Sequence, residues 1–291
     1  MNSVLIIGAS GLLGRTLVKK FINKARIGVL CRNPKKYKIN TIRTYSIDVL
    51  EAVPLDAIIR EYDTIINCVG QITSPISNCL TLNTVGVKNI VDSVKKYNKE
   101  LIHISTVSVY GSANYVDEDS KLNPETPYGS IKCFSEYLIK SNIKKYTILR
   151  VSNLYGSSQK KGIIGYLTNS YLSDENEINF NNDGSLKRYY LHIDDLSNVI
   201  VQIYMKDISG VYNIIGQDFL TIKGIILMFE SVLDYKFDVT YDDIKPIENI
   251  KVIDNSKLEN LLSIGNKTSV KSYIKDIYNY KRTNIFTNEE S

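Results

Sequence analysis

Tyr128 and Lys132 are the residues of this sequence whose types and spacing most directly suggest catalysis. They stand four positions apart at the start of a predicted helix, so both side chains project from one face. A tyrosine with a pKa of about 10 is a poor acid–base group at neutral pH. A neighbouring ammonium group stabilises the phenolate and lowers that pKa. The pair therefore predicts a proton-transfer site, in which Lys132 could also hold a cofactor ribose.

A hydroxyl group is expected beside this pair. Ser105 is the last residue of a predicted strand over Leu101–Ser105, and Thr106 follows it directly. Ligands of parallel α/β sheets bind at the carboxyl ends of the strands. We expect Thr106 to hydrogen-bond the reacting oxygen of a substrate there, and Ser105 to contribute to substrate binding.

A glycine-rich loop follows the first apolar strand and opens an amphipathic helix, the context that a dinucleotide-binding loop requires. Its glycines permit a sharp turn and close approach of the backbone to a pyrophosphate at the helix start. The spacing is GxxGxxG. The cofactor-binding residues that it predicts are Gly8, Ser10, Gly11, Leu12, Leu13 and Gly14.

The end of the second strand bears on the choice of cofactor, because an acid there binds the ribose hydroxyls of NAD. Here Arg32 follows Cys31 and no acid is present. Arg32 could pair with the 2′-phosphate of NADP, helped by Lys35 or Lys36, and a solvated basic turn is the alternative. Further along, Asp48 and Val49 are expected at the adenine edge, and Val69 and Gly70 against the cofactor.

Short apolar runs alternate with amphipathic ones over the first 150 residues, the pattern of parallel strands joined by helices. The predicted strands are Ser3–Ile7, Ile27–Cys31, Ile42–Tyr45, Thr64–Asn67, Leu101–Ser105 and Tyr146–Arg150. The predicted helices are Leu12–Asn23, Leu80–Tyr97 and Tyr128–Lys140, with another near Leu196–Met205. The fold class is thus α/β, a Rossmann doubly wound parallel sheet with a smaller C-terminal α+β substrate lobe.

The sequence pattern predicts a dinucleotide-binding domain over 1–155 and a substrate lobe mainly over 156–280. Residues near 190–215 are expected to return to the dinucleotide-binding domain. A turn-rich piece over 175–184 marks the change of pattern. The polar stretch 281–291 lacks periodicity and predicts a disordered tail.

Composition excludes some classes of protein. The net charge of +5 is spread along the chain, so nothing supports nucleic-acid binding. The four cysteines and two histidines lack metal-ligand or disulfide spacing, and no metal is expected. No apolar run approaches the 18 residues of a membrane span, and no signal segment is recognisable. We expect a cytoplasmic protein that does not bind membranes.

Several segments resemble the extended short-chain dehydrogenase/reductase family of nucleotide-sugar epimerases, dehydratases and reductases. Residues 105–111 resemble its S-[ST]-x-x-V-Y-G segment, with Thr106 at the catalytic hydroxyl position, and 127–132 resemble its P-Y-G-x-S-K region. Residues 149–156 are similar to L-R-x-x-N-V-Y-G and residues 184–195 to G-x-x-x-R-D-F-I-H-V-D-D. The resemblance implies that Asn153 and Arg188 bind the substrate phosphates, although Tyr189 replaces the usual acid.

The resemblance also limits the reactions that are expected of this protein. Dehydratases of this family carry an Asp-Glu pair after the catalytic threonine, and Val107 and Ser108 stand there instead. Because Arg32 favours NADP, the leading interpretation is an NADPH-dependent reductase of a nucleotide-linked 4-keto sugar. An NAD-dependent nucleotide-sugar 4-epimerase is the alternative. A non-catalytic NAD(P)-binding sensor is a third possibility, although such regulators tend to lose the Tyr/Lys pair.

Family members commonly form two-fold dimers through a four-helix bundle, so the resemblance implies a homodimer through the predicted helices Leu80–Tyr97 and Tyr128–Lys140. Both carry apolar stripes, of which one part must cover the sheet. Only the residues beyond that part are left for a partner.

Overall fold

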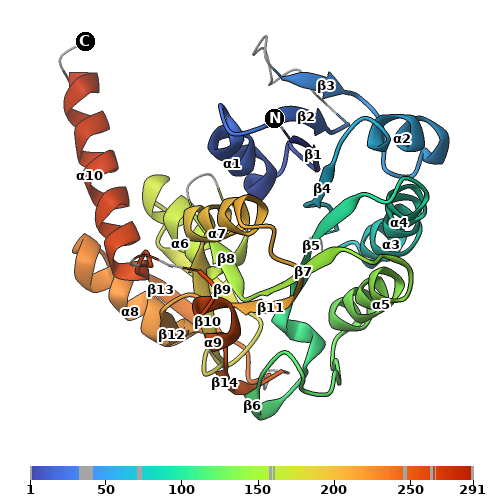
Figure 1. Ribbon diagram of the computed structural model, residues 1–291. Coiled ribbons are helices and arrows are strands. Elements are labelled where there is room, and N and C mark those ends of the chain that lie inside the picture. Colours follow the sequence, from blue (N-terminus) through green and yellow to red (C-terminus); the bar gives the residue numbers. More distant parts are fainter. Residues whose placement is uncertain are drawn as a thin grey trace.

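Seven parallel strands form the central sheet of this protein (Figure 1). The computed structural model describes residues 2–32, 42–70, 74–156, 159, 161–244, 248–262, 265 and 267–289. In spatial order the strands are β3 (Arg43–Tyr45), β2 (Arg26–Leu30), β1 (Ser3–Ile7), β4 (Thr64–Asn67), β5 (Glu100–Thr106), β7 (Tyr146–Val151) and β11 (Gly210–Ile214). The order reverses direction at β1, which creates the crevice where such sheets bind ligands.

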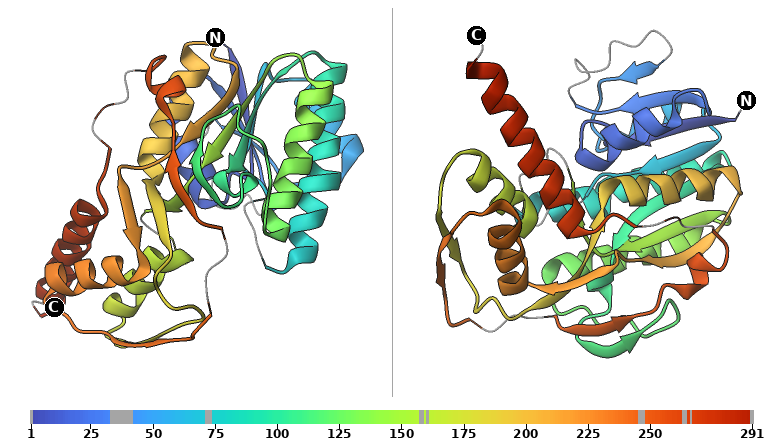
Figure 2. Two further views of the ribbon diagram at one scale, coloured as in Figure 1. Left: turned by 90° about the horizontal axis from the view of Figure 1, so that it is seen from below. Right: turned by 90° about the vertical axis from the view of Figure 1, so that its left-hand side faces the viewer.

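Helices cover both faces of this sheet (Figures 1 and 2). On one face, α1 (Leu12–Phe21) and α7 (Ile193–Met205) bury apolar residues of the strands. On the other face lie α2 (Ala52–Ile59), α4 (Val87–Lys96) and α5 (Pro127–Asn142). Strands buried on both faces must be apolar on both, and β1 is buried at all five positions.

The chain enters α4 through two shorter pieces, the helix α3 (Ile76–Thr81) and the π-helical turn η1 (Leu82–Gly86). The sequence predicted one helix over Leu80–Tyr97. The apolar period is nearly continuous through the three pieces, so it gives no sign of the wider turn. π-Helical turns are often found at functional sites.

A second group of elements lies beside the sheet and contains most of the chain after residue 152 (Figure 2). One small sheet has the order β12 (Asp218–Thr221), β10 (Lys187–His192), β8 (Asn153–Tyr155), and β9 (Glu177–Phe180) pairs with β13 (Asp238–Tyr241). The helices α6 (Gly162–Leu172), α8 (Ile222–Leu233) and α10 (Val270–Glu289) share an apolar core with them. The short helix α9 (Ser256–Glu259) packs near β11.

A returning segment ties the two parts together. Strand β14 (Ile250–Ile253) pairs in parallel with β6 (Ala113–Val116), which follows the single turn η2 (Val107–Val109) after β5. Ile250 and Ile253 share a cluster of buried residues with Val109 and Tyr110. The second group of elements is thus anchored next to the carboxyl end of β5.

The predicted fold class is confirmed. The strand predictions Ser3–Ile7 and Thr64–Asn67 coincide with β1 and β4, and the others differ by one residue at one or both ends. The chain end differs from expectation, because α10 continues to Glu289 where the sequence predicted a disordered tail from Lys281. Lys281 Nζ donates to the carbonyl of Tyr171 at 2.6 Å and pairs with Asp174, which fastens the helix to the end of α6.

Candidate active site

The glycine loop between β1 and α1 has the backbone geometry that a bound pyrophosphate requires. Gly8 has a φ of +81°, a conformation that side chains disfavour. A Cβ atom on Gly14 would lie 2.4 Å from the carbonyl oxygen of Gly8, so only glycine lets α1 approach β1 this closely. Ser10 and Gly11 are exposed, and Leu12, Leu13 and Gly14 form the first turn of the helix. The amides of a first turn have no intrahelical partners and can bind an anion.

Residues that could meet the adenosine half lie after β2 and β3. Arg32 is exposed, and its carbonyl accepts a bond from the Ser46 hydroxyl. Asp48 is half-buried and accepts from the amide of Leu50, while Val49 is buried. Lys35 and Lys36, the suggested helpers of Arg32, lie outside the described residues.

The loop after β4 closes over the glycine loop from the other side. A Cβ on Gly8 would lie 2.9 Å from Val69, so these two loops are in contact. Gly70 has a φ of +84°, and its carbonyl accepts a bond from the Asn83 amide in η1 at 3.0 Å. Val69 thus packs against the glycine loop, and the contact of Val69 and Gly70 with a cofactor stays a prediction.

Thr106 and Ser105 end β5, but their side chains have different surroundings. The Thr106 hydroxyl oxygen accepts the amide of Ser108 at 3.2 Å, which leaves the hydroxyl proton to be donated. Ser105 is fully buried and donates to Glu136 at 2.6 Å. Ser105 therefore binds α5 to the sheet through Glu136, and this arrangement does not favour the predicted contact of Ser105 with substrate.

Helix α5 starts in a way that sets the position of Tyr128. The Thr126 hydroxyl caps the helix by accepting the amide of Gly129 at 3.1 Å, and Pro127 occupies the first helical position. Tyr128 follows directly and is half-buried. Burial raises the pKa of its phenol above the ordinary value, and the neighbouring Cys79 and Glu248 add to this rise.

Lys132 is one turn further and fully buried. Its Nζ atom donates to the Ile104 carbonyl at 2.6 Å and to Asn83 Oδ1 at 3.2 Å, and lies 3.4 Å from His103 Nε2. Burial lowers the pKa of Lys132 to about 7. Burial therefore disfavours the ammonium form of Lys132, whose charge was expected to activate Tyr128.

The predicted phosphate-binding residues Asn153 and Arg188 both come from the small sheet beside this site. Asn153 is exposed in β8 and pairs with Tyr190 of β10. The Arg188 guanidinium donates to the carbonyl of Glu248, and its ion pair with the Glu248 carboxylate spans 3.8 Å. Burial lowers the pKa of Arg188, although the facing Glu248 opposes this.

Glu248 was not predicted from the sequence, and it connects the two groups of elements. Its carboxylate accepts the hydroxyl of Ser108 at 3.1 Å and that of Thr126 at 2.8 Å. It thus links Arg188 to the residues that flank Thr106 and Tyr128. Its neighbours in the sequence carry no pattern that marks a site, so only the fold could bring it here.

Sequence reasoning missed His103, and it gave Asn67 and Asn83 no role of their own in the site. All three are fully buried around Lys132. A histidine in the middle of an apolar strand, such as His103 in β5, was the available signal, because a buried imidazole requires partners.

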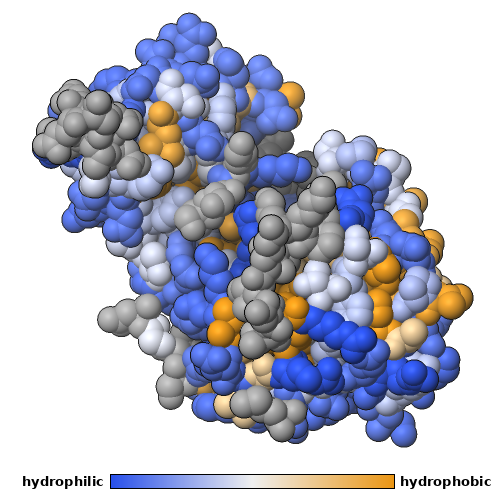
Figure 3. Space-filling model, turned by 90° about the horizontal axis from the view of Figure 1, so that it is seen from above, coloured by the Kyte–Doolittle hydropathy of each residue, from blue (hydrophilic) through white to orange (hydrophobic). Residues whose placement is uncertain are grey.

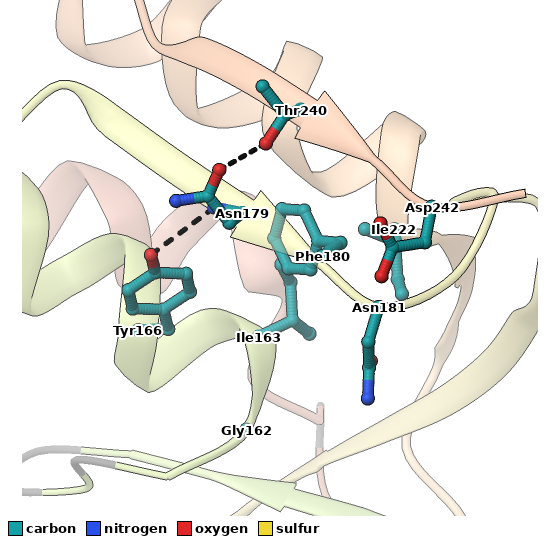
Figure 4. Close-up of a pocket in the computed structure, with 9 residues that line it drawn as sticks. All are labelled: Gly162, Ile163, Tyr166, Asn179, Phe180, Asn181, Ile222, Thr240 and Asp242. Carbon is teal, nitrogen blue, oxygen red and sulfur yellow. Dashed lines mark hydrogen bonds between the residues drawn. The ribbon is translucent and has the colours of Figure 1, made fainter.

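A cavity of about 550 Å³ lies among α6, β9, β13 and α8 (Figure 4). Tyr166, Ile163 and Phe180 form its apolar side, and Asn179, Asn181 and Asp242 supply polar groups. Tyr166 Oη accepts a hydrogen bond from the backbone amide of Asn179, and Asn179 Oδ1 accepts one from the Thr240 hydroxyl. The cavity combines an aromatic surface with amide groups, a combination that suits a planar heterocycle.

Among the described residues, no group of three metal-ligating side chains occurs, and no helix is long and apolar enough to cross a membrane. The glycine cradle and the helix start fit a dinucleotide, since added Cβ atoms would fill the space that the close backbone packing needs.

Comparisons with known proteins agree with this geometry. A putative UDP-glucose 4-epimerase of Methanocaldococcus jannaschii is 25% identical over 97% of this chain and 99% of its own length. The methionine adenosyltransferase 2 subunit beta of Xenopus tropicalis is 25% identical over 94% of this chain and 86% of its own. The UDP-glucuronic acid 4-epimerase of Bacillus cereus, solved with UDP-glucuronic acid and NAD, superposes with a TM-score of 0.85 at 23% identity, covering 97% and 99% of the two chains.

The match to a family profile shows which family the chain belongs to, which the individual likenesses do not show alone. Residues 4–214 match the profile described as the NAD dependent epimerase/dehydratase family, and they include the glycine loop, Thr106, Tyr128, Lys132 and Arg188. The resemblance seen in the sequence is thereby confirmed: the chain is an enzyme of the NAD dependent epimerase/dehydratase family.

Proposed function

We propose that this protein is an NAD-dependent epimerase of a nucleotide-linked sugar. The observation that carries the proposal is that α5, which bears Tyr128 and Lys132, packs at the carboxyl end of β5, where Thr106 lies, in a chain that matches a putative epimerase over nearly its whole length. Val107 and Ser108 occupy the places of the acids that dehydratases of the family use, which argues against dehydration.

In the proposed reaction, Tyr128 moves the proton of the sugar hydroxyl and Thr106 orients the same oxygen by a hydrogen bond. Bound NAD supplies a reversible hydride acceptor for the sugar carbon. The loops that carry Gly8, Gly14 and Val69 would hold the dinucleotide against the sheet. Removal and return of hydride on opposite faces of the sugar inverts one carbon with no net redox change.

Substrate binding is assigned to residues of the smaller sheets. Arg188 and Asn153 would hold the phosphates, and the cavity beside Phe180 and Tyr166 would take the nucleotide base by stacking. If so, Phe180→Ala should raise the KM for the nucleotide sugar and leave kcat nearly unchanged. A KM equal to that of the wild type would remove the cavity from the binding site.

Incubation with UDP-, dTDP-, GDP- and CDP-sugars tests the reaction itself. NMR analysis of the products should find an inverted sugar carbon, with catalytic rather than stoichiometric amounts of NAD. Inversion by the wild type and its loss in Tyr128→Phe would support the proposal, and stoichiometric oxidation or reduction of the cofactor would contradict it.

The second candidate is the NADPH-dependent reductase of a 4-keto sugar, which one observation favours: the exposed Arg32 stands where an acid would bind the ribose of NAD. Fluorescence titration with NAD and NADP separates the two. Tighter binding of NADP, with a preference that moves toward NAD in Arg32→Asp, would favour the reductase. Tighter binding of NAD by the wild type would favour the epimerase.

The presence of Thr106, Tyr128 and Lys132 argues against a non-catalytic, dinucleotide-binding role. Absence of turnover with every nucleotide sugar, together with dinucleotide binding, would favour it.

We further infer a homodimer formed by α4 and α5 with the corresponding helices of a second copy. Val87, Ile90, Val91 and Val94 of α4 all face the sheet core and are not available to a partner. Other apolar residues on this side reach the surface: Phe134 and Tyr137 of α5, with Leu80 of α3 and Val85 of η1. They provide the exposed apolar stripe that the arrangement needs.

A further inference from the structure

The Nζ atom of Lys132 lies among buried hydrogen-bonding groups whose donor and acceptor roles follow from their other partners. Its partners in the described part of the chain are the Ile104 carbonyl at 2.6 Å, Asn83 Oδ1 at 3.2 Å and His103 Nε2 at 3.4 Å. Lys132 and His103 are both fully buried. Water cannot rearrange around them freely, so each donor must meet an acceptor.

Asn67 determines which nitrogen of His103 carries the proton. The Asn67 Oδ1 atom accepts the amide of Val69 at 3.1 Å, so the Nδ2 group of the same side chain points to His103 Nδ1, also at 3.1 Å. An amide nitrogen only donates, and His103 Nδ1 must therefore accept. A neutral ring then carries its proton on Nε2, the atom that faces Lys132.

Asn83 is oriented with equal clarity. Its Nδ2 group donates to the carbonyls of Gly70 at 3.0 Å and Cys79 at 2.9 Å, which leaves Oδ1 to accept from Lys132. Lys132 thus faces two acceptors, Asn83 Oδ1 and the Ile104 carbonyl, and one donor, His103 Nε2–H. A neutral amine has two N–H groups and one lone pair, which matches this set. An ammonium group, with three N–H groups, would oppose the imidazole proton.

We propose that His103 and Asn67 are positioning residues that hold Lys132 as a neutral amine in the cofactor-free protein. The inference concerns the resting state of the Tyr128–Lys132 pair, and its role in catalysis rests on the proposed function. An uncharged lysine leaves the Tyr128 phenol protonated. When the pair ionises, the O–H bond of Tyr128 breaks and a third N–H bond forms on Lys132, directly or through a bridging hydroxyl, so the charge of the pair stays at zero.

The charged and titratable groups around Lys132 agree with this assignment. Glu136 on α5 lies nearby, but its carboxylate is bonded to Arg150 and Ser105. Burial raises the pKa of the thiols of Cys68, after β4, and Cys79, on α3, so both are neutral near pH 7. Burial also lowers the pKa of His103 well below its ordinary value, which keeps the ring neutral.

The histidine tautomer can be read directly, because the chain contains only two histidines. Long-range ¹H–¹⁵N spectra of the ¹⁵N-histidine-labelled, cofactor-free protein should show His103 with a protonated Nε2 and an unprotonated Nδ1 at pH 8. The His192→Asn variant assigns the two rings and serves as the matched control, with unchanged His103 signals. Protonation of His103 on Nδ1, or on both nitrogens, would overturn the proposal.

The isosteric Asn67→Asp variant tests the cause. Its carboxylate can accept from His103 Nδ1–H, which would turn the Nε2 lone pair toward Lys132 and favour the ammonium form. The ¹³Cε signal of Lys132, assigned with Lys132→Met, should titrate near pH 7 in the wild type. In Asn67→Asp the midpoint should rise by about one pH unit or more, roughly a tenfold change in the population of amine.

A Lys132 midpoint above about 10 in the wild type, its ordinary value, would contradict the neutral amine whether or not the variant folds. None of these measurements uses turnover. Failure of the epimerase assay would therefore leave the protonation result standing, and an ordinary lysine titration would leave the epimerase proposal standing.

Discussion

Tyr128, the proposed proton-transfer group, has surroundings that oppose its ionisation. Burial raises the pKa of the phenol, and Glu248 and Cys79 act in the same direction. The ionised form must therefore gain its stabilisation from Lys132 and from ligands. Because the Tyr128 hydroxyl is the group that transfers the proton in the proposed reaction, Tyr128→Phe should lower turnover by a factor on the order of 10² to 10⁴. The Kd for NAD should stay nearly unchanged.

Steady-state rates and fluorescence titration measure these two quantities for Tyr128→Phe. Tyr280→Phe is a matched control, since Tyr280 lies on α10 with 62% of its surface exposed. Near-normal turnover of the Tyr128 variant would exclude it as the acid–base group. A large loss of NAD affinity would mean that the phenol serves mainly in cofactor binding.

Several site residues were predictable because their chemistry is local. The glycine loop follows a strand within a few residues, and Tyr128 and Lys132 share one helix. His103 and Glu248 were not predictable, because their roles depend on contacts over 29 residues to Lys132 and 140 residues to Ser108. The protonation state of Lys132 likewise depends on burial, which no spacing encodes.

The elements of the parallel sheet were readable from the sequence because each buried strand is a short apolar run between polar turns. The small strands β8, β9, β12 and β13 have only three or four residues each and mix polar with apolar side chains. Their pairing is set by distant partners, so the second half of the chain was predicted only in outline. The last part of α10 likewise contacts a distant residue, through the ion pair of Lys281 with Asp174.

Helix α5 is held on the sheet by a buried ion pair between Glu136 and Arg150 of β7. Both side chains are 1% exposed, and the closest atoms lie 2.8 Å apart. Burial opposes the charge on Glu136, but the bonds from Arg150 and Ser105 prevail and hold its pKa below the ordinary value. Glu136→Gln leaves the Arg150 charge without its partner and should reduce the free energy of unfolding by about 3 to 5 kcal/mol.

Urea unfolding at pH 7 measures this loss, with Asp92→Asn as the control. Asp92 belongs to the exposed pair with Lys88 on α4, and its removal should change little. Because the folded-state pKa of Glu136 is lowered, its contribution is complete above the unfolded pKa of about 4.3 and is lost as the pH falls through the folded value. The difference between wild type and Glu136→Gln should therefore shrink below about pH 4. A constant difference down to pH 2 would contradict this role.

The contact of α1 with β1 leaves no space at Gly14. An added Cβ would lie 2.4 Å from the Gly8 carbonyl oxygen and 2.6 Å from Ala9 Cα, both backbone atoms. Gly14→Ala should therefore displace the helix start, cost about 1 to 3 kcal/mol of stability and weaken NAD binding by roughly tenfold or more. Gly265→Ala is the matched control, because a Cβ there meets nothing within 4 Å. Equal NAD affinity in the two variants would show that the loop does not hold the dinucleotide.

At the scale of the whole molecule, the candidate site lies between two groups of elements. The sheet supplies Thr106 from β5, and the helix α5 that packs on it supplies Tyr128 and Lys132, whereas Arg188 comes from β10 and Glu248 from the segment before β14. The contacts of Glu248 with Ser108 and Thr126 join the groups beside Tyr128. The proposed phosphate-binding residues and the proposed cofactor-binding residues thus belong to different parts of the chain, which suits a reaction between two bound molecules.

The face of the protein that Figure 3 shows is mostly polar, with apolar residues on the right of that view, the side on which α2 to α5 lie in Figure 1. On α5, Phe134 is 45% and Tyr137 is 67% exposed, in a helix whose opposite face packs on the sheet. A second copy related by a two-fold axis would bury the same stripe of both molecules and remove these residues from water. It would also stiffen the helix that carries Tyr128 and Lys132.

Sedimentation velocity should therefore find a dimer of twice 33.0 kDa at micromolar concentration. The double variant Phe134→Glu, Tyr137→Glu places charges in the apolar stripe and should yield monomers with lower turnover. Leu227→Glu is the matched control, since Leu227 on α8 is 64% exposed but lies outside the stripe, and it should leave the dimer intact. A wild-type monomer with full activity would rule out this interface, and a dimer that survives the double variant would place the contact elsewhere on the molecule.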